Sequence, residues 1–90
     1  MSQIVVKRGG GDESFDTKKL YASIYTSMLA AKETVKTSEY AANEVSKYVH
    51  TWAQKYSEVT TKDIRIEAAR KLQEFNTNAH FLYVHHKLLF

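Results

Sequence analysis

The first fifteen residues have an extended rather than a helical pattern of hydrophobic positions. Ile4, Val5 and Val6 form a β-branched run, and three glycines at residues 9–11 separate it from a polar and then aromatic segment. Glycine takes a positive φ freely, so glycines between two short extended segments are typical of a β-hairpin. The pattern predicts a hairpin over residues 4–15. Because an isolated two-stranded hairpin is marginal in water, we expect it to pack as a lid on the rest of the domain.

From residue 17 onward the hydrophobic positions have helical spacing. Leu20, Ile24 and Met28 lie four residues apart and predict a helix over residues 17–31, with Asp16 as a candidate N-cap. A second helix is expected over residues 38–56, after a cap at Thr37 or Ser38. Its hydrophobic face is the most regular in the chain and comprises Ala41, Val45, Tyr48, Val49, Trp52, Ala53 and Tyr56.

Two further helices are expected after residue 60. Thr60 is followed three residues later by Asp63, a spacing similar to a capping box, and predicts a helix over residues 61–75. A polar break at residues 76–78 precedes a short helix over residues 79–89. The predicted fold class is α+β and mostly helical, one domain over residues 1–90 with the hairpin lid packed on four helices. The expected core contains Ile24, Met28, Val45, Val49, Trp52, Ile64, Ala68 and Leu72.

Composition narrows the class of protein. Of the 90 residues 43% are hydrophobic and 26% charged, which is typical of a folded globular chain and not of a disordered one. No apolar run approaches the length of a membrane span, and the N-terminus has no secretory pattern. The chain has no cysteine, which excludes disulfides, thiol nucleophiles and cysteine-ligated zinc. We therefore expect a soluble, cytoplasmic protein.

The charge is mildly basic. Thirteen Lys and Arg residues against ten Asp and Glu give a net charge of +3, which favours anionic partners weakly. Several lysines appear scattered over different helix faces rather than along one stripe, which disfavours nucleic acid as the partner. The alternatives that stay open at this point are a small basic helical nucleic-acid-binding domain and a protein-interaction domain without a nucleotide ligand.

Catalytic and metal-binding patterns are not found. No serine or threonine lies in a nucleophile-elbow motif. Of the four histidines, His80 and His85 are five residues apart and His85 and His86 are adjacent, so neither pair has the spacing of three or four that a helical metal site needs. We expect no enzyme activity and no metal site formed by histidines.

Basic residues do gather near the glycine triplet. Lys7 and Arg8 end the first expected strand, and Lys19 lies one turn into the first helix. Glycines allow the backbone to approach an anion closely, and the start of a helix offers unpaired amides and a positive dipole end. The Walker and GxGxxG spacings are absent, so this pattern predicts an anion site of another kind or a solvated basic turn.

The same stretch has a family resemblance. Residues 5–20, which read VVKRGGGDESFDTKKL, resemble the opening of the ATP-cone, a small regulatory domain of ribonucleotide reductases and of their transcriptional repressor. Gly9 stands where the family usually has Asp. Residues 59–64 resemble the segment that opens the third helix of the family, and Tyr83 and Lys87 have the spacing of an aromatic and a basic residue near its C-terminus.

The resemblance implies a function. It implies that ATP or dATP, with or without Mg²⁺, binds between the hairpin and the helices and regulates a partner such as ribonucleotide reductase or a second cone by self-association. It assigns the phosphates to Lys7, Arg8, Lys19 and Lys87. It assigns the base and sugar to Val5, Glu13, Phe15, Asp16, Leu20, Thr61, Arg65 and Tyr83. The chain lacks the zinc ribbon of the repressor and the cysteines of a reductase, so we expect a free-standing or excised regulatory cone.

Overall fold

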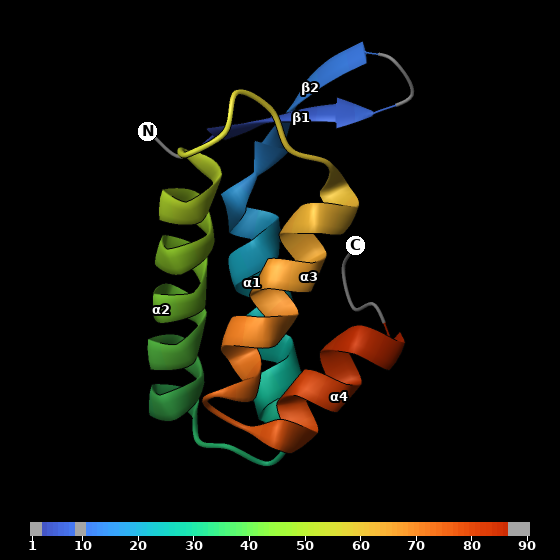
Figure 1. Cartoon of the computed structure of the whole chain (residues 1–90). Helices are drawn as coiled ribbons and strands as arrows, with labels where there is room; N and C mark the ends of the chain where they lie inside the picture. Colours follow the sequence, from blue (N-terminus) through green and yellow to red (C-terminus); the bar gives the residue numbers. More distant parts are fainter. Residues whose placement is uncertain (1–2, 9–10, 87–90) are drawn as a thin grey trace.

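The computed structural model describes residues 3–8 and 11–86, with side chains described for residues 17–85. Four helices form most of it: α1 (Thr17–Ala30), α2 (Val35–Ala53), α3 (Thr61–Gln73) and α4 (Thr77–His86). Both α1 and α3 pack against α2 and α4. Figure 1 shows α2 on the left, α3 in front of α1, and α4 crossing obliquely at the lower right. α3 therefore has a helical neighbour on each side.

Two short strands precede the helices. β1 (Gln3–Arg8) and β2 (Gly11–Asp16) pair antiparallel, with Gln3 opposite Asp16 and Arg8 opposite Gly11. β2 leads directly into α1, and β1 contacts α3. Figure 1 shows the two strands at the upper end of the helices, with the tip of the pair extending past them.

The predicted fold class is wrong. An α+β fold was expected, with the hairpin as a lid packed on the helices, whereas the structure is a four-helix domain whose described core lies between the helices. Every described buried side chain lies on a helix or, for Val59, in the connection between α2 and α3. A two-stranded ribbon has too little surface to enclose a core of its own, while four amphipathic helices enclose one by themselves. A β-branched run beside glycines therefore indicated extended backbone but not what that backbone covers.

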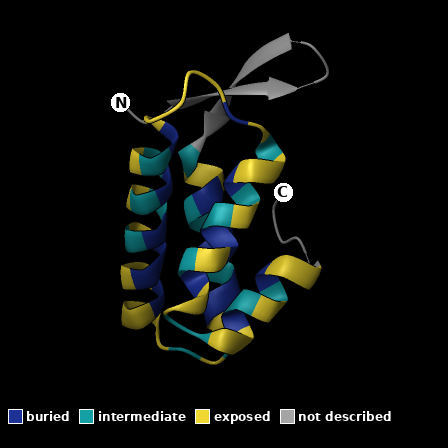
Figure 2. Cartoon of the chain, in the orientation of Figure 1, coloured by how far each residue is buried: buried dark blue, intermediate teal, exposed yellow. Residues whose placement is uncertain are grey.

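The core runs along the inner faces of all four helices (Figure 2). The predicted core residues other than Trp52 are confirmed, since each is fully buried. They repeat every three or four residues, so they share one side of each helix. The confirmed residues are Ile24, Met28, Val45, Val49, Ile64, Ala68 and Leu72.

Trp52 is the exception. It was expected to be largely buried, but it is only partly buried at the edge of the core, with its ring centroid 5.4 Å from that of Tyr56. The adjacent Ala53 takes the inward position at this level of α2 and is buried. A tryptophan at the edge of the hydrophobic stripe still packs on the core but leaves part of its surface in solvent.

Capping side chains fix where the helices begin. α2 starts three residues earlier than predicted, because Thr34 and not Thr37 or Ser38 is its N-cap; the Thr34 hydroxyl accepts from the Thr37 amide at 3.1 Å. The capping box predicted for α3 is confirmed. The Asp63 amide donates to the Thr60 hydroxyl at 3.0 Å, and the Thr60 amide donates to the Asp63 carboxylate at 3.3 Å. These bonds satisfy amides that the helix itself leaves unpaired.

Candidate functional site

A groove lies between α3 and α4 in the part of the chain that the structure describes. Its volume is about 710 Å³, which lies within the range of small-molecule sites. The groove is open to solvent along one side. It is lined by Thr61, Lys62, Arg65, Ile66, Ala69, Arg70, Gln73, His80, Tyr83 and Val84.

The α3 wall follows from helical spacing. Thr61, Arg65, Ala69 and Gln73 are each four residues apart, so they form one stripe along α3, and all four line the groove. The capping box at Thr60 fixes the start of this stripe.

The α4 wall is anchored at its start. Asn76 precedes α4, and its side-chain oxygen accepts from the Ala79 amide at 2.8 Å while its side-chain nitrogen donates to the Glu33 carboxylate at 2.6 Å. Ala79 is fully buried. Asn76 therefore caps the first turn of α4 and also bonds it to the connection between α1 and α2. These two bonds help set the direction in which α4 leaves α3.

Tyr83 forms the floor of the groove. Only 3% of its surface is exposed, although it lines the hollow. Burial raises the pKa of the Tyr83 phenol above its ordinary value, and the positive charge of Arg65 partly opposes that rise. The side chain is thus a neutral aromatic surface with a cationic side chain nearby, an arrangement suited to a planar ring and an anion together.

His80 is fixed by a hydrogen bond across the groove. Its Nδ1 lies 2.7 Å from the carbonyl oxygen of Ala69 on α3. A carbonyl oxygen only accepts hydrogen bonds, so Nδ1 carries the proton and donates it. In a neutral imidazole the other nitrogen, Nε2, is then an acceptor.

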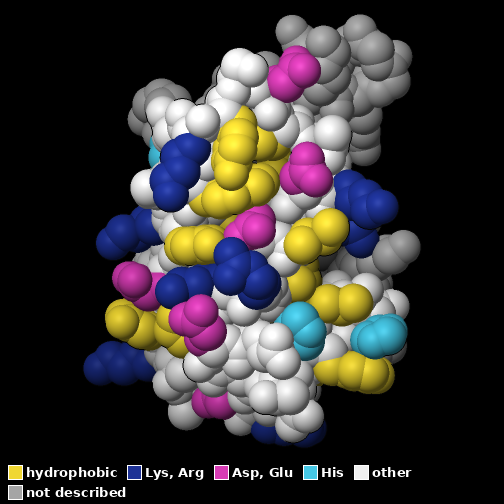
Figure 3. Space-filling view, viewed as in Figure 1, with side chains coloured by type: hydrophobic (Ala, Val, Ile, Leu, Met, Phe, Trp, Pro, Cys, Tyr) yellow, Lys and Arg dark blue, Asp and Glu magenta, His cyan; other side chains and the backbone are white. Residues whose placement is uncertain are grey.

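The charges in the groove are positive but unequal. Lys62 is exposed and Arg65 is partly buried, both near the start of α3. Arg70 lies farther along and forms an ion pair with Glu67; this hydrogen-bonded carboxylate raises the pKa of Arg70 above its ordinary value. Figure 3 shows hydrophobic, basic and acidic side chains interspersed on this face, with histidine side chains over α4 at the lower right. Lys62 and Arg65 therefore place positive charge at the end of the groove nearest the start of α3.

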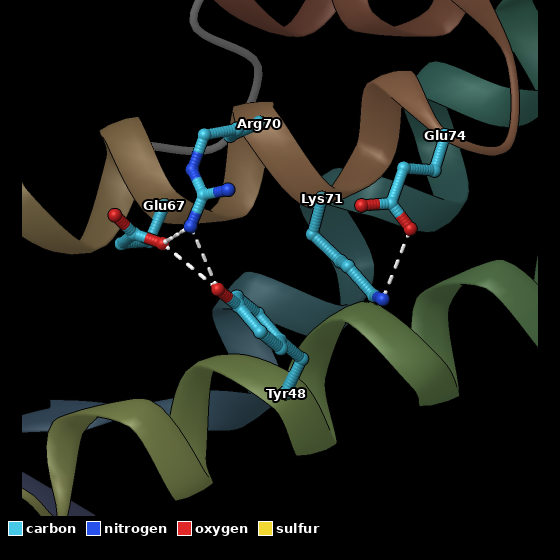
Figure 4. Close-up of polar contacts among 5 residues, drawn as sticks. All are labelled: Tyr48, Glu67, Arg70, Lys71 and Glu74. Atoms are coloured by element: carbon cyan, nitrogen blue, oxygen red, sulfur yellow. Dashed lines mark hydrogen bonds and ion pairs between the residues drawn. The ribbon is translucent and has the colours of Figure 1, made fainter.

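A polar cluster closes the other side of α3. The Tyr48 hydroxyl donates to the Glu67 carboxylate at 3.1 Å and accepts from Arg70 at 2.8 Å (Figure 4). Lys71 donates to Glu74 at 3.0 Å, and its ammonium lies 5.1 Å from the centre of the Tyr48 ring. These contacts join α2 to α3, so they stabilise the wall of the groove from behind.

Three of the residues that the resemblance assigns to the base and sugar lie together. Thr61 and Arg65 on α3 and Tyr83 on α4 all line the groove. Leu20 does not, because it is fully buried in the core, and Lys19 is exposed on α1 but is not among the residues that line the groove.

The other assigned residues lie outside the described side chains. They are Lys7, Arg8, Val5, Glu13, Phe15, Asp16 and Lys87. All of them except Lys87 belong to β1 or β2, and Asp16 is the residue at which β2 meets α1. Lys87 follows α4 in the sequence.

Sequence reasoning missed part of the site. Lys62, Ile66, Gln73, His80 and Val84 line the groove but were not assigned to it. Gln73 was accessible from the four-residue spacing that starts at Thr61. The position of His80 was not, since its bond to Ala69 depends on the angle between two helices.

Two other classes of site are absent from the described residues. Over the described stretches no three His, Cys, Asp or Glu side chains come together as a metal site would need. Among the described helices, none combines the length and the apolar character that a bilayer crossing requires.

Comparison of the chain with protein-family models, curated proteins and solved structures finds no match. The resemblance to the ATP-cone therefore remains a prediction.

Proposed function

We propose that the chain is a non-catalytic regulatory module that binds an adenine nucleotide, ATP or dATP, in the groove between α3 and α4. The observation that carries the proposal is the convergence of Thr61, Arg65 and Tyr83 on one groove. These three residues come from two helices, and the sequence resemblance implies a contact with the base or sugar for each of them.

The groove has the chemistry that such a ligand needs. Ile66 and Val84 are exposed and supply apolar surface for a purine ring, and the largely buried Tyr83 lines the groove between α3 and α4 as well. Arg65 and Lys62 supply positive charge, and an arginine can hold phosphate oxygens in pairs. Since Lys62 and Arg65 lie toward the start of α3, the phosphates would face β1 and the base would lie beside α4.

The proposed phosphate ligands include residues of the strand pair. β1 contacts α3, and Lys7 and Arg8 are the last two residues of β1. With Lys19 and Lys87 they would complete the positive charge around a triphosphate, with Mg²⁺ shared by the phosphates if it is bound. A module of this kind would act by binding alone, with no hydrolysis of the nucleotide.

Regulation would follow from linkage. If a partner favours the nucleotide-bound shape, it must tighten ATP binding by the same factor by which ATP tightens the partner. The proposed partners are ribonucleotide reductase or a second copy of the chain. Self-association is the simpler of the two to measure, by light scattering with and without ATP.

The test is calorimetric titration of the full chain with ATP, dATP, GTP and AMP, with and without Mg²⁺. We expect saturable binding of ATP or dATP at about micromolar affinity, which corresponds to about 8 kcal/mol, and no phosphate release over hours. Inorganic triphosphate serves as the control for charge alone. If no adenine nucleotide binds, or if single-stranded DNA binds more tightly than ATP at physiological salt, the proposal is wrong.

A further inference from the structure

We infer that His80 selects the base of the nucleotide, by accepting a hydrogen bond at Nε2 from an amino group on the edge of the ring. The inference rests on the proposed function and goes beyond it, since neither the sequence pattern nor the resemblance assigns His80 to the site. It names the specificity-determining contact and the chemical class that it favours, a 6-aminopurine.

The tautomer comes from a single fixed bond. Nδ1 of His80 is 2.7 Å from the Ala69 carbonyl oxygen, so it must donate, and Nε2 is left as the acceptor. The bond joins α4 to α3 and also holds the plane of the ring. A histidine held at one nitrogen presents the other in a defined direction, as histidines do when a second partner orients them at a functional site.

The other polar side chains in the groove include three that only donate. Lys62, Arg65 and Arg70 donate only, while Thr61, Gln73 and Tyr83 can donate or accept. His80 differs because a neutral ring with a protonated Nδ1 can only accept at Nε2. A ligand that matches this set has acceptor oxygens at one end and an N–H donor at the other.

The position along α3 fits that order. Ala69, which His80 contacts, lies four residues beyond Arg65 and seven beyond Lys62, or roughly 6 and 10 Å along a helix axis. Lys62 and Arg65 thus face the phosphate end, and His80 lies beyond them at the level of Ala69, where the neighbouring Arg70 is paired with Glu67. In this orientation the 6-amino group of adenine is the hydrogen-bond donor that would face His80.

Discrimination follows from the acceptor. A 6-oxo base such as hypoxanthine or guanine places an oxygen, also an acceptor, where adenine has its amino group. Two acceptors that face each other cannot form a hydrogen bond, so Nε2 of His80 would lose its water and gain no partner. Polar sites discriminate best between ligands when the wrong ligand leaves a polar atom unpaired in this way. ATP and ITP carry the same sugar and phosphates, so the ratio of their dissociation constants isolates this contact.

The experiment measures that ratio at pH 8, above the ordinary titration range of imidazole. The test variant is His80→Asn, since an asparagine amide can still donate to the Ala69 carbonyl but cannot accept at the position of Nε2. The control is His85→Asn, a histidine on the exposed face of the same helix that does not line the groove. Thermal unfolding of both variants checks that the fold is kept.

We expect the parent chain and His85→Asn to bind ATP about ten- to a hundredfold more tightly than ITP. His80→Asn should bring the two constants to within about threefold of each other, mainly by weakening ATP. If the parent binds ATP and ITP equally, or if His80→Asn weakens both by one factor, the inference is wrong while the proposed function stands. If the parent binds neither, both are wrong.

A second measurement does not depend on a variant. Long-range ¹H–¹⁵N correlation of the His80 ring should show a protonated Nδ1 and an unprotonated Nε2 in the free chain. Saturation with ATP should shift the Nε2 resonance, and saturation with inorganic triphosphate should not. A protonated Nε2 in the free chain at pH 8, or an Nε2 signal that ATP leaves in place, contradicts the inference.

Discussion

The two sides of α3 differ sharply although one short helix provides both. Toward α2, α3 presents Ile64 and Leu72, which are fully buried. The rim of that interface is sealed by the Tyr48, Glu67 and Arg70 hydrogen bonds (Figure 4). Toward α4, the stripe that begins at Thr61 borders an open groove of about 710 Å³. One side is closed by packing and the other is left available for a ligand.

The difference comes from the partner helices. α2 has 19 residues, whereas α4 has 10 and leaves α3 at an angle (Figure 1). α4 is held close where His80 meets Ala69 and where Ala79 enters the core. A short oblique helix cannot cover a neighbour completely, so the hollow follows from helix length and direction and not from a missing side chain.

Truncation on each side should show this contrast most strongly. Leu72→Ala removes a fully buried side chain and should lower the free energy of unfolding by about 2 to 5 kcal/mol, as large-to-small changes in a core do. Ile66→Ala, at a groove position that is 53% exposed, should change it by only about 0.5 to 1 kcal/mol. Urea unfolding of the two variants measures both. Equal losses would mean that the α4 side is packed as tightly as the α2 side.

Much of the helical part could be predicted from sequence because it depends on local spacing. Ile24, Met28, Val45 and Val49 repeat at the helical period, and that period alone fixes which side of a helix faces inward. α3 begins at the predicted residue because its capping box is also local. The fold class failed for the opposite reason. What the strand pair covers depends on contacts between distant parts of the chain, which spacing does not encode.

The site could be predicted only in part for the same reason. Thr61, Arg65 and Tyr83 were assigned by resemblance, and they do lie in one groove. Leu20 was assigned to the same ligand but is fully buried, because it lies on the side of α1 that faces the core. His80 was not assigned, since its partner is a carbonyl oxygen eleven residues away on another helix.

Loss of charge in the groove should affect binding more than stability. Arg65→Ala should weaken ATP about ten- to a hundredfold, since a charged contact to phosphate or sugar in a partly desolvated groove is worth roughly 1.5 to 3 kcal/mol. Titration calorimetry measures the change. The matched control is Lys47→Ala, which removes one positive charge from an exposed position on α2, where Lys47 lies 3.7 Å from Glu44. Equal weakening by both variants would indicate a general charge effect and not a site.

High pH should destabilise the chain through Tyr83. Its pKa is raised by burial, so the phenol stays protonated in the folded chain while the unfolded chain ionises it above its ordinary value near 10. The unfolded state then holds fewer protons, and the stability falls as pH rises, by at most about 1.4 kcal/mol per pH unit from this group. Tyr83→Phe should not show this loss of stability at high pH. Urea unfolding from pH 8 to 11 measures the free energy of unfolding of the parent chain and of Tyr83→Phe, and an equal dependence on pH in both would contradict the prediction.

A small effect is expected in the polar cluster on the closed side. Tyr48→Phe removes the hydroxyl that bonds Glu67 and Arg70 but keeps the ring under the Lys71 ammonium. The hydroxyl is only partly buried and Glu67 and Arg70 still pair with each other, so the expected loss of stability is about 0.5 to 1.5 kcal/mol.

The same variant tests whether the two sides of α3 are independent. Tyr48 does not line the groove, so ATP affinity should stay within about twofold of the parent chain. Arg70, however, belongs to both sides of α3. It lines the groove, and its guanidinium donates to the Tyr48 hydroxyl and pairs with the Glu67 carboxylate, which orient it. A loss of ATP affinity beyond about fivefold would mean that the closed side positions Arg70 for the ligand. The contrast between a structural and a functional face of α3 would then be wrong, and the polar cluster would be part of the site.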